Sequence, residues 1–398
     1  MKYDFETVLN RKGKDSKAFD VIPFEGVATD EGFDPIPMWI ADMSFPVSPA
    51  VTKAILKRME MPNYGYFALP QEYFDTIISW QRRRNGVTGL EEKYIGYENG
   101  VLGGISSAVQ AFSSPGEKIL MHSPTYVGFT HVMEDTGRPV IHSELKRDEN
   151  GIWRMDYEDM DAKLKANNIH LAIFCSPHNP CGRVWERWEI EKAMEVYAAN
   201  DCIVISDEIW SDIIMPGHRH IPTQTISEDA KNRVIAFYSA SKTASLAGLV
   251  GSYHIIYNSL LRDRIAHRAE MSHYNDQNVL SVHSLIGAFS AEGEEWIDEM
   301  IQVIEKNFSY AADFIAKNFD GVEFMKPEGT YMLYLDCGKW CQAHGVSITE
   351  LQHRGVRCGV IWQDGEAFCR KDTIRMNLAL PFSRLEEAMD RLKKYAFI

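Results

Sequence analysis

Asp-Cys-Ile-Val-Ile-Ser-Asp-Glu, residues 201–208, is an apolar run that ends in a serine and two carboxylates. Residues 169–175, Ile-His-Leu-Ala-Ile-Phe-Cys, have the same character. Nearly continuous apolar runs of this length are typical of strands that are buried on both faces of a sheet. A helix-length stretch, residues 187–200, separates the two runs. This alternation predicts an open, mainly parallel α/β sheet.

Outward from residues 201–208, further segments have strand character. The expected strands are residues 118–122, 139–144, 171–175, 202–207, 234–239 and 252–257. In open α/β sheets, ligands bind at the carboxyl ends of the strands. We therefore expect the chemistry of the protein where these apolar runs stop.

The two ends of the chain have a different pattern. Ser48-Pro49 predicts the start of a helix, with serine as N-cap and proline in the first turn. Ser383-x-x-Glu386 predicts a capping box ahead of a C-terminal helix. Other apolar residues repeat at helical spacing, namely Ile304, Phe308, Ala311 and Ile315, and then Leu385, Met389 and Leu392.

Two strand-like segments, residues 332–337 and 373–380, lie among these helices. Together they predict a smaller α+β domain built from both chain ends. We expect a large ligand-binding α/β domain over residues 46–285 and a small domain formed by residues 1–45 and 286–398.

Composition excludes several classes of protein. The 398 residues are 45% hydrophobic and 25% charged, which is typical of a globular chain. The net charge of −14 argues against a nucleic-acid partner, and no apolar run approaches the ~20 residues of a membrane helix. The first residues lack the apolar stretch of a signal peptide, and seven cysteines are an odd number, so we expect a cytoplasmic protein.

Cys175, His178 and Cys181 lie close together in the sequence. Structural zinc sites usually have four ligands and closely paired cysteines. This segment has neither, and its two prolines favour a shaped loop, so we expect no metal here.

Three short segments carry side chains suited to catalysis. Asn99-Gly100 opens a helical pattern, so the backbone N–H groups of Val101 and Leu102 are suited to a phosphate, although such turns are common. Asp207 ends a buried strand, where a carboxylate is costly unless a cation pairs with it. Lys242 follows the strand at 234–239, and a partly dry site would make it a competent amine. A capped helix and a solvated lysine are the alternatives.

In order along the chain, these segments resemble the fold type I enzymes that depend on pyridoxal 5′-phosphate (PLP). The motif Ser-x-Ser-Lys-Thr-x-x-x-Ala-Gly is similar to the segment whose lysine, here Lys242, forms a Schiff base with the cofactor. The resemblance implies a seven-stranded, mainly parallel sheet. It also implies that Asp207 pairs with the pyridine nitrogen, that Asn179 binds the phenolic oxygen and substrate, and that Arg375 binds the substrate α-carboxylate.

The same resemblance implies further roles. Tyr126 would stack on the pyridine ring, with a core aromatic as the alternative. Ser239 and Ser241 would hold the phosphate together with the backbone at residues 101–102. Tyr64 would reach the phosphate of a second subunit, which implies a homodimer with shared active sites; its alternative is a tyrosine packed within its own loop.

A narrower resemblance concerns residues 37–43, Pro-Met-Trp-Ile-Ala-Asp-Met, and residues 64–66, Tyr-Gly-Tyr. Both resemble the carbon–sulfur β-lyases of the cystathionine β-lyase PatB/MalY type, and they place Trp39 and Ala41 beside the substrate. Ser44 departs from this branch, which usually has aspartate there. Val250 stands where typical transaminases have a phosphate-binding arginine, as in the lyases.

Trp210 is a second departure, at a cofactor-binding position where transaminases have tyrosine and the lyases commonly have histidine. Its indole N–H can donate a hydrogen bond but cannot accept one. We expect a C–S β-lyase that releases pyruvate, ammonia and a thiol from a small amino-acid substrate. The alternatives are a class I/II aminotransferase, more distantly a racemase, or a regulatory protein that retains PLP.

Overall fold

The computed structural model describes residues 1–398, and a seven-stranded sheet forms its centre. All neighbouring strands are parallel except β10, which pairs antiparallel with both β2 and β9. The expectation of a mainly parallel α/β sheet is therefore confirmed. The strands, in spatial order, are β2 (Ile95–Asn99), β10 (Gly251–Ile255), β9 (Val234–Tyr238), β8 (Ile203–Asp207), β7 (Leu171–Cys175), β3 (Ile119–Ser123) and β4 (Val140–Glu144).

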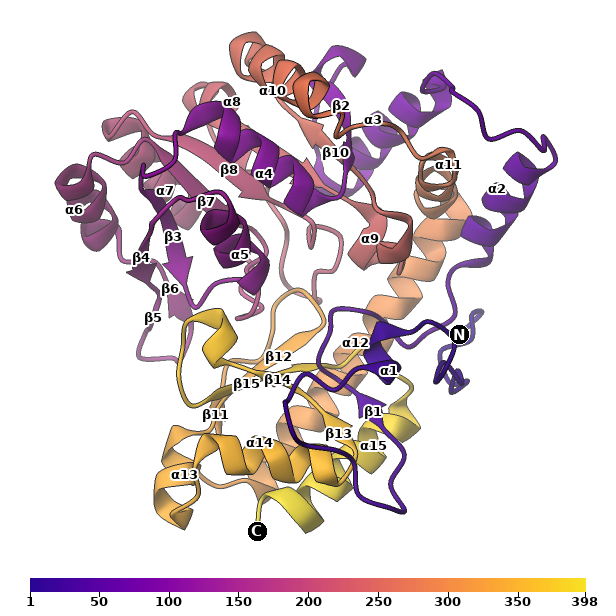
Figure 1. The fold of residues 1–398 in the computed structure, drawn as a ribbon, viewed down its shortest axis with the longest axis vertical. Coiled ribbons are helices and arrows are strands. Elements are labelled where there is room, and N and C mark those ends of the chain that lie inside the picture. Colours follow the sequence, from indigo (N-terminus) through magenta and orange to yellow (C-terminus); the bar gives the residue numbers. More distant parts are fainter.

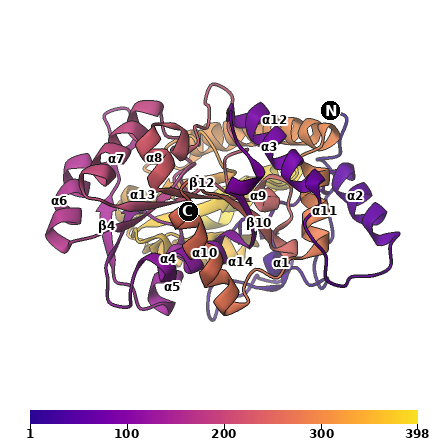
Figure 2. The same ribbon diagram turned by 90° about the horizontal axis from the view of Figure 1, so that it is seen from above.

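Helices cover both faces of this sheet, as the view from above shows (Figure 2). Successive strand residues point to opposite faces, so Ile205 packs under one helical layer and Val204 under the other. One layer consists of α4 (Val101–Phe112), α5 (Val127–Asp135) and α10 (Ser259–Ser272), and the other includes α6 (Tyr157–Asn167), α7 (Arg187–Ala199) and α8 (Glu228–Arg233). Burial on both faces explains why these strands are continuous apolar runs.

A second, four-stranded sheet lies in the lower half of the molecule (Figure 1). It is antiparallel, in the order β11 (Glu323–Phe324), β12 (Met332–Asp336), β15 (Thr373–Asn377) and β14 (Gln363–Asp364). Two short pairs complete the strands: β1 (Ile36–Pro37) with β13 (Val360–Ile361), and β5 (Lys146–Arg147) with β6 (Trp153–Arg154). The boundaries proposed at residues 45/46 and 285/286 stay a prediction.

The long helix α12 (Ala291–Asn318) runs between the two halves (Figure 1). Its predicted apolar stripe, Ile304 to Ile315, is buried. The predicted start of α2 (Pro49–Met59) is also confirmed, because Ser48 accepts a hydrogen bond from the backbone N–H of Ala50. The other helices are α1 (Lys17–Asp20), α3 (Gln71–Asn85), α9 (Ala240–Thr243), α11 (Val279–Ala288), α13 (Gly338–His344), α14 (Ile348–Arg357) and α15 (Phe382–Arg391).

The predicted capping box at Ser383 is wrong. The helix α15 begins at Phe382 and has Pro381 as its N-cap, with no side-chain cap. Ser383 therefore lies inside the first turn rather than before it. Proline at the N-cap has neither a side-chain acceptor nor an N–H that could complete a capping box. Instead, the N–H groups of Arg384 and Leu385 donate to the Pro381 carbonyl.

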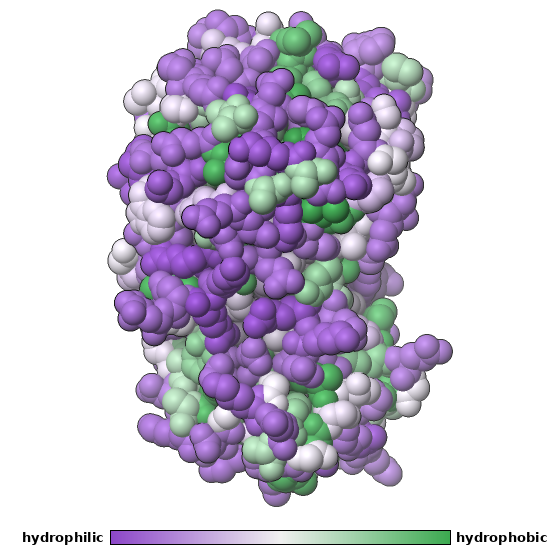
Figure 3. Space-filling model, turned by 90° about the vertical axis from the view of Figure 1, so that its left-hand side faces the viewer, coloured by the Kyte–Doolittle hydropathy of each residue, from purple (hydrophilic) through white to green (hydrophobic).

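The surface differs between two sides of the molecule. The side that carries α6 is mostly hydrophilic, with apolar residues in small separate patches (Figure 3). On the opposite side, α2 and the segment after it expose large apolar side chains, namely Leu56, Met59, Met61, Tyr64 and Tyr66. No helix of the chain combines the length and apolar character needed to cross a membrane.

Candidate active site

A cavity of about 230 Å³ lies where the carboxyl ends of β8 and β9 meet the start of α4. It brings together nine of the residues expected at the site: Ala41, Val101, Leu102, Tyr126, Asn179, Asp207, Trp210, Ser241 and Lys242. Gly100, Ile209, Ala247 and Val250 complete its lining. The chemistry-bearing side chains thus gather where the strand pattern predicts them.

Lys242 lies on α9, in the turn that follows β9. Its Nζ donates a hydrogen bond to the carbonyl oxygen of Ala41, at 3.0 Å, rather than to Asp207. Burial, assisted by the nearby charge of Arg375, lowers the pKa of Lys242 to about 8. Its amine is therefore neutral, and nucleophilic, at a much lower pH than that of a solvated lysine.

Asp207 is the last residue of β8 and is almost fully buried. Its Oδ1 accepts a hydrogen bond from the backbone N–H of Ile209 at 3.0 Å. Burial raises the pKa of this carboxyl to about 7, although the N–H and Lys242 oppose the shift. A cationic hydrogen-bond donor in the cavity would stabilise the carboxylate, and the protonated pyridine nitrogen of PLP is such a group.

Arg375, on β15, is a buried cation without a carboxylate partner. Its guanidinium donates to Asn179 Oδ1 at 3.0 Å and to the Trp39 carbonyl at 2.9 Å, and its Nε has no partner. Burial lowers its pKa to about 10. Buried cations are normally paired with an anion, so this guanidinium suits the α-carboxylate of a bound amino acid.

The segment over residues 37–43 is held by the small sheet. Asn377 of β15 donates from its backbone to the Met38 carbonyl and from its side chain to the carbonyls of Ile40 and Asp42. These bonds fix the intervening Ala41 carbonyl opposite Lys242. The indole of Trp39 points away, because its Nε1 donates to the Ala18 carbonyl at 3.0 Å. Only the backbone of Trp39 reaches Arg375.

The opposite end of the cavity suits a phosphate. Gly100 has a φ of +81°, a conformation that favours glycine, and it turns the chain from β2 into α4. The first N–H groups of a helix have no acceptor within the helix, so those of Val101 and Leu102 are available to an anion. The Ser241 side chain lies beside them, whereas Ser239 does not line the cavity: its Oγ caps α9 and contacts the Gly251 carbonyl.

Two aromatic residues form part of the wall. Trp210 packs edge-on against Tyr331, with ring centroids 4.7 Å apart, and its indole N–H has no acceptor within the chain, so it can donate to a ligand. Tyr126 packs against Phe129 and over Gly128, where a Cβ would lie 2.5 Å from the tyrosine ring. Gly128 therefore gives Tyr126 the room to form the wall.

Tyr64 lies outside the cavity of its own chain. It is 56% exposed, between α2 and α3, and its ring lies 5.8 Å from the guanidinium of Arg58. A role at the cofactor of a second subunit stays a prediction.

Two buried carboxylates that the sequence analysis did not single out support the site. Asp212 accepts hydrogen bonds from Trp80 Nε1 at 2.9 Å and from Thr243 Oγ1, next to Lys242, at 3.0 Å. Glu208, next to Asp207, is bonded to Ser206, His220, Thr223 and Tyr238. The sequence offers one sign of their importance: both lie in residues 207–212, Asp-Glu-Ile-Trp-Ser-Asp, at the end of β8.

The family model described as "Aminotransferase class I and II" matches residues 35–392. The chain belongs to this family. Its relatives include cystathionine beta-lyase PatB of Bacillus subtilis (strain 168), 33% identical over 90% of this chain and 92% of that protein, and protein MalY of Escherichia coli (strain K12), 26% identical over 97% of each.

Solved structures of similar shape cover nearly the whole chain. The PLP-bound C-S lyase from Staphylococcus hominis has a TM-score of 0.89 at 29% identity and covers 98% of each chain. Cystalysin from Treponema denticola, which contains pyridoxal 5′-phosphate, has a TM-score of 0.91 at 28% identity and covers 99% of this chain and 98% of that one. The expected fold is therefore confirmed.

Proposed function

We propose that this chain is a PLP-dependent carbon–sulfur β-lyase that converts a thioether amino acid such as cystathionine to pyruvate, ammonia and a thiol. The observation that carries the proposal is one cavity that combines a lysine amine of lowered pKa, a buried aspartate and, behind Asn179, a buried arginine without an anion. The lyases PatB and the Staphylococcus hominis enzyme support it by their similarity.

The residues present fit the cofactor. Lys242 would carry it, Asp207 would keep its pyridine nitrogen protonated, and Asn179 and Trp210 would bind its phenolic oxygen. The start of α4 and Ser241 would hold its phosphate. When bound, PLP supplies an electron sink that makes the Cα–H bond of the substrate acidic.

The protein then controls where the proton goes. Arg375 offers a planar fork to the substrate α-carboxylate, which fixes the direction of the Cα–H bond. Lys242 would take the proton from that carbon, because its lowered pKa makes it a base near neutral pH. The Ala41 carbonyl holds the Lys242 ammonium or amine in place between proton transfers.

The lining favours a neutral substituent on Cβ. Lys242 and Asp207 are the only charged residues among those that line the cavity, and Leu102, Ile209, Trp210 and Val250 form apolar parts of its wall. A dicarboxylate such as glutamate needs a second cation for its side chain, because burying an unpaired carboxylate is costly. The thioether sulfur carries no charge, and the distal half of cystathionine, which has its own ammonium beside its carboxylate, has no net charge. This favours the lyase over a glutamate-dependent aminotransferase.

Product analysis tests the proposal. With L-cystathionine alone, the protein should release pyruvate and ammonia in equal amounts, and Lys242→Ala should release neither. Turnover that requires 2-oxoglutarate and yields glutamate instead of pyruvate would contradict the lyase and identify an aminotransferase.

We further propose a homodimer in which Tyr64 reaches the phosphate in the other subunit. The large apolar side chains exposed on and after α2 support this, since apolar residues gathered at the surface are typical of association sites. We also propose a cytoplasmic location, which the seven unpaired cysteines support.

A further inference from the structure

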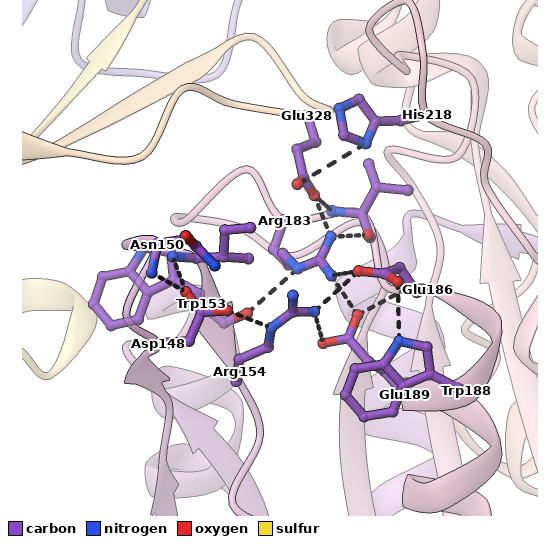
Figure 4. Close-up of polar contacts among 12 residues, drawn as sticks. Asp148, Asn150, Trp153, Arg154, Arg183, Glu186, Trp188, Glu189, His218 and Glu328 are labelled. Atoms are coloured by element: carbon purple, nitrogen blue, oxygen red, sulfur yellow. Dashed lines mark hydrogen bonds and ion pairs between the residues drawn. The ribbon is translucent and has the colours of Figure 1, made fainter.

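An ion network centred on the buried Arg183 joins the two halves of the molecule (Figure 4). The Arg183 ion network consists of Arg154, Arg183, Glu186, Glu189 and Glu328. Arg183 is 1% exposed and donates to Glu328, to Glu189 and, at 2.9 Å, to Glu186. Arg154 donates to Glu189 at 2.9 Å and to Glu186 at 3.0 Å. Glu328 alone comes from the C-terminal part of the chain, 145 residues after Arg183.

Glu328 anchors the start of the small sheet. Its carboxylate accepts a hydrogen bond from the Val184 N–H at 3.0 Å, and its own N–H donates to the Gly182 carbonyl at 2.8 Å. Gly182 has a φ of +69°, and a Cβ there would lie 2.7 Å from Pro327, so the two backbones meet closely. Residues 327–330, which lead directly into β12, are therefore fixed to the turn at 178–183.

That turn also carries Asn179. It is closed by hydrogen bonds from the His178 N–H to the Arg183 carbonyl, 2.8 Å, and from the Gly182 N–H to the His178 carbonyl, 2.7 Å. Asn179, inside the turn, accepts the hydrogen bond of Arg375. Arg375 in turn sits on β15, opposite Tyr334 of β12. Glu328 and the Asn179–Arg375 bond thus tie the same turn to the same pair of strands at two points.

We propose that Glu328, through Arg183, is a positioning residue for Arg375. By fixing Arg375, it sets the distance between the substrate-carboxylate site and the cofactor site. The inference rests on the proposed function, because it takes Arg375 as the group that binds the α-carboxylate. Glu328 touches neither ligand. It acts by holding β12, and with it β15, against the turn that carries Asn179.

The network itself predicts that the link can be weakened without unfolding the protein. If Glu328 loses its charge, Arg183 still pairs with Glu186 and Glu189, which belong to its own half of the molecule. No buried cation is therefore left unpaired. Removing one partner of a buried ion pair is strongly destabilising when it leaves the other charge unpaired. Glu328→Gln should therefore fold, bind PLP and loosen only the position of β12.

The experiment compares two ligands of the PLP-bound protein, L-alanine and ethylamine, which differ at Cα by the carboxylate. Their dissociation constants are read from the change in cofactor absorption. Glu328→Gln should raise the dissociation constant of L-alanine roughly tenfold and change that of ethylamine by less than about twofold. In an Arg375→Lys background, Glu328→Gln should add no further loss for L-alanine, because the two changes act on one interaction.

Glu305→Gln is the matched control. Glu305 forms an ion pair, at 2.6 Å, with Lys326, which lies two residues before Glu328 in the sequence. This pair is partly exposed and lies outside the Arg183 ion network. The substitution should change the binding of neither ligand.

If Glu328→Gln loses affinity for both ligands equally, or for neither, the proposal is overturned. If Glu328→Gln does not fold, Glu328→Asp, which keeps the charge on a shorter side chain, must show the same preferential loss of L-alanine or the proposal is wrong. A wild-type protein whose cofactor absorption responds to no amine would instead overturn the proposed function, and this inference with it.

Discussion

Arg375 shows how burial can leave a cation without an anionic partner. Its guanidinium has only neutral partners, Asn179 and the Trp39 carbonyl. Arg375→Lys keeps a positive charge but loses the planar fork that can bind a carboxylate at two points. We expect the dissociation constant of L-alanine to rise roughly 100-fold, because a charge-assisted bidentate bond is lost. Titration of the cofactor absorption measures it.

Arg370→Lys is the control for that substitution. Arg370 lies five residues before Arg375 but is partly exposed, 3.6 Å from Asp336, so its loss should leave ligand binding unchanged. An Arg375→Lys variant that binds L-alanine as the wild type does would show that the carboxylate site lies elsewhere.

Lys242 makes a pH prediction. Burial disfavours the ammonium, so the folded-state pKa falls to about 8 and the neutral amine prevails above that pH. The rate at which the cofactor-free protein captures PLP should rise with pH up to about 8 and then level off. Stopped-flow absorbance between pH 6 and pH 10 would measure this. A rate that continues to rise towards pH 10.5, the value of a solvated lysine, would contradict the lowered pKa.

Sequence reasoning found the residues that end apolar strands and missed those that act by long-range pairing. Asp207 and Lys242 were predicted because each follows a buried strand, and such strand ends meet at one edge of a sheet. Glu328 could not be predicted, because its partner Arg183 is 145 residues away and only the fold brings them together. Tyr64 stays a prediction, because its proposed contact lies in another subunit.

Among the elements, α4 is the one through which we expect packing to affect cofactor binding. Gly104 lies in its first turns, and a Cβ there would be 2.4 Å from the Phe237 ring on β9. Gly104→Ala should therefore lower the free energy of unfolding by about 1–3 kcal/mol through overpacking. The substitution should also weaken the binding of PLP, because it should move the N–H groups of Val101 and Leu102 away from the phosphate. Thermal unfolding and cofactor titration measure the two effects.

Gly248→Ala supplies the comparison for α4. A Cβ at Gly248 meets nothing within 4 Å, and the residue is exposed near the cavity. Both measurements should match the wild type there. Equal behaviour of the Gly104 and Gly248 variants would mean that α4 does not set the phosphate position.

At the same scale, strand prediction succeeded where both faces of a strand are apolar. The six predicted strands of the large sheet agree with the structure to within about two residues at each end. The strand β2 was missed because Ile95–Asn99 contains glycine and two polar residues. Its Glu98 is fully buried, yet it is bonded to His254 at 2.7 Å and to Asn275 at 2.9 Å, which no local pattern reveals.

For the whole molecule, the active site is assembled from distant parts of the chain, and we propose that a second subunit completes it. Mixing two inactive variants tests this. Lys242→Ala and Tyr64→Ala should each lose activity, but a hybrid dimer contains one site with both residues intact. Subunits that mix at random would restore about a quarter of the wild-type sites.

The readout is lyase activity after the two variants are unfolded and refolded together. The same variants refolded separately and then combined are the control. If the refolded mixture is no more active than that control, Tyr64 does not act across a subunit interface.

Chemical labelling of Lys242 tests the proposed Schiff base with PLP. The purified protein is incubated with PLP, reduced with borohydride, digested and analysed by mass spectrometry. We expect one phosphopyridoxyl group, on the peptide that contains Lys242, and none in Lys242→Ala. A label on another lysine, or no label at all, would show that Lys242 does not bind PLP.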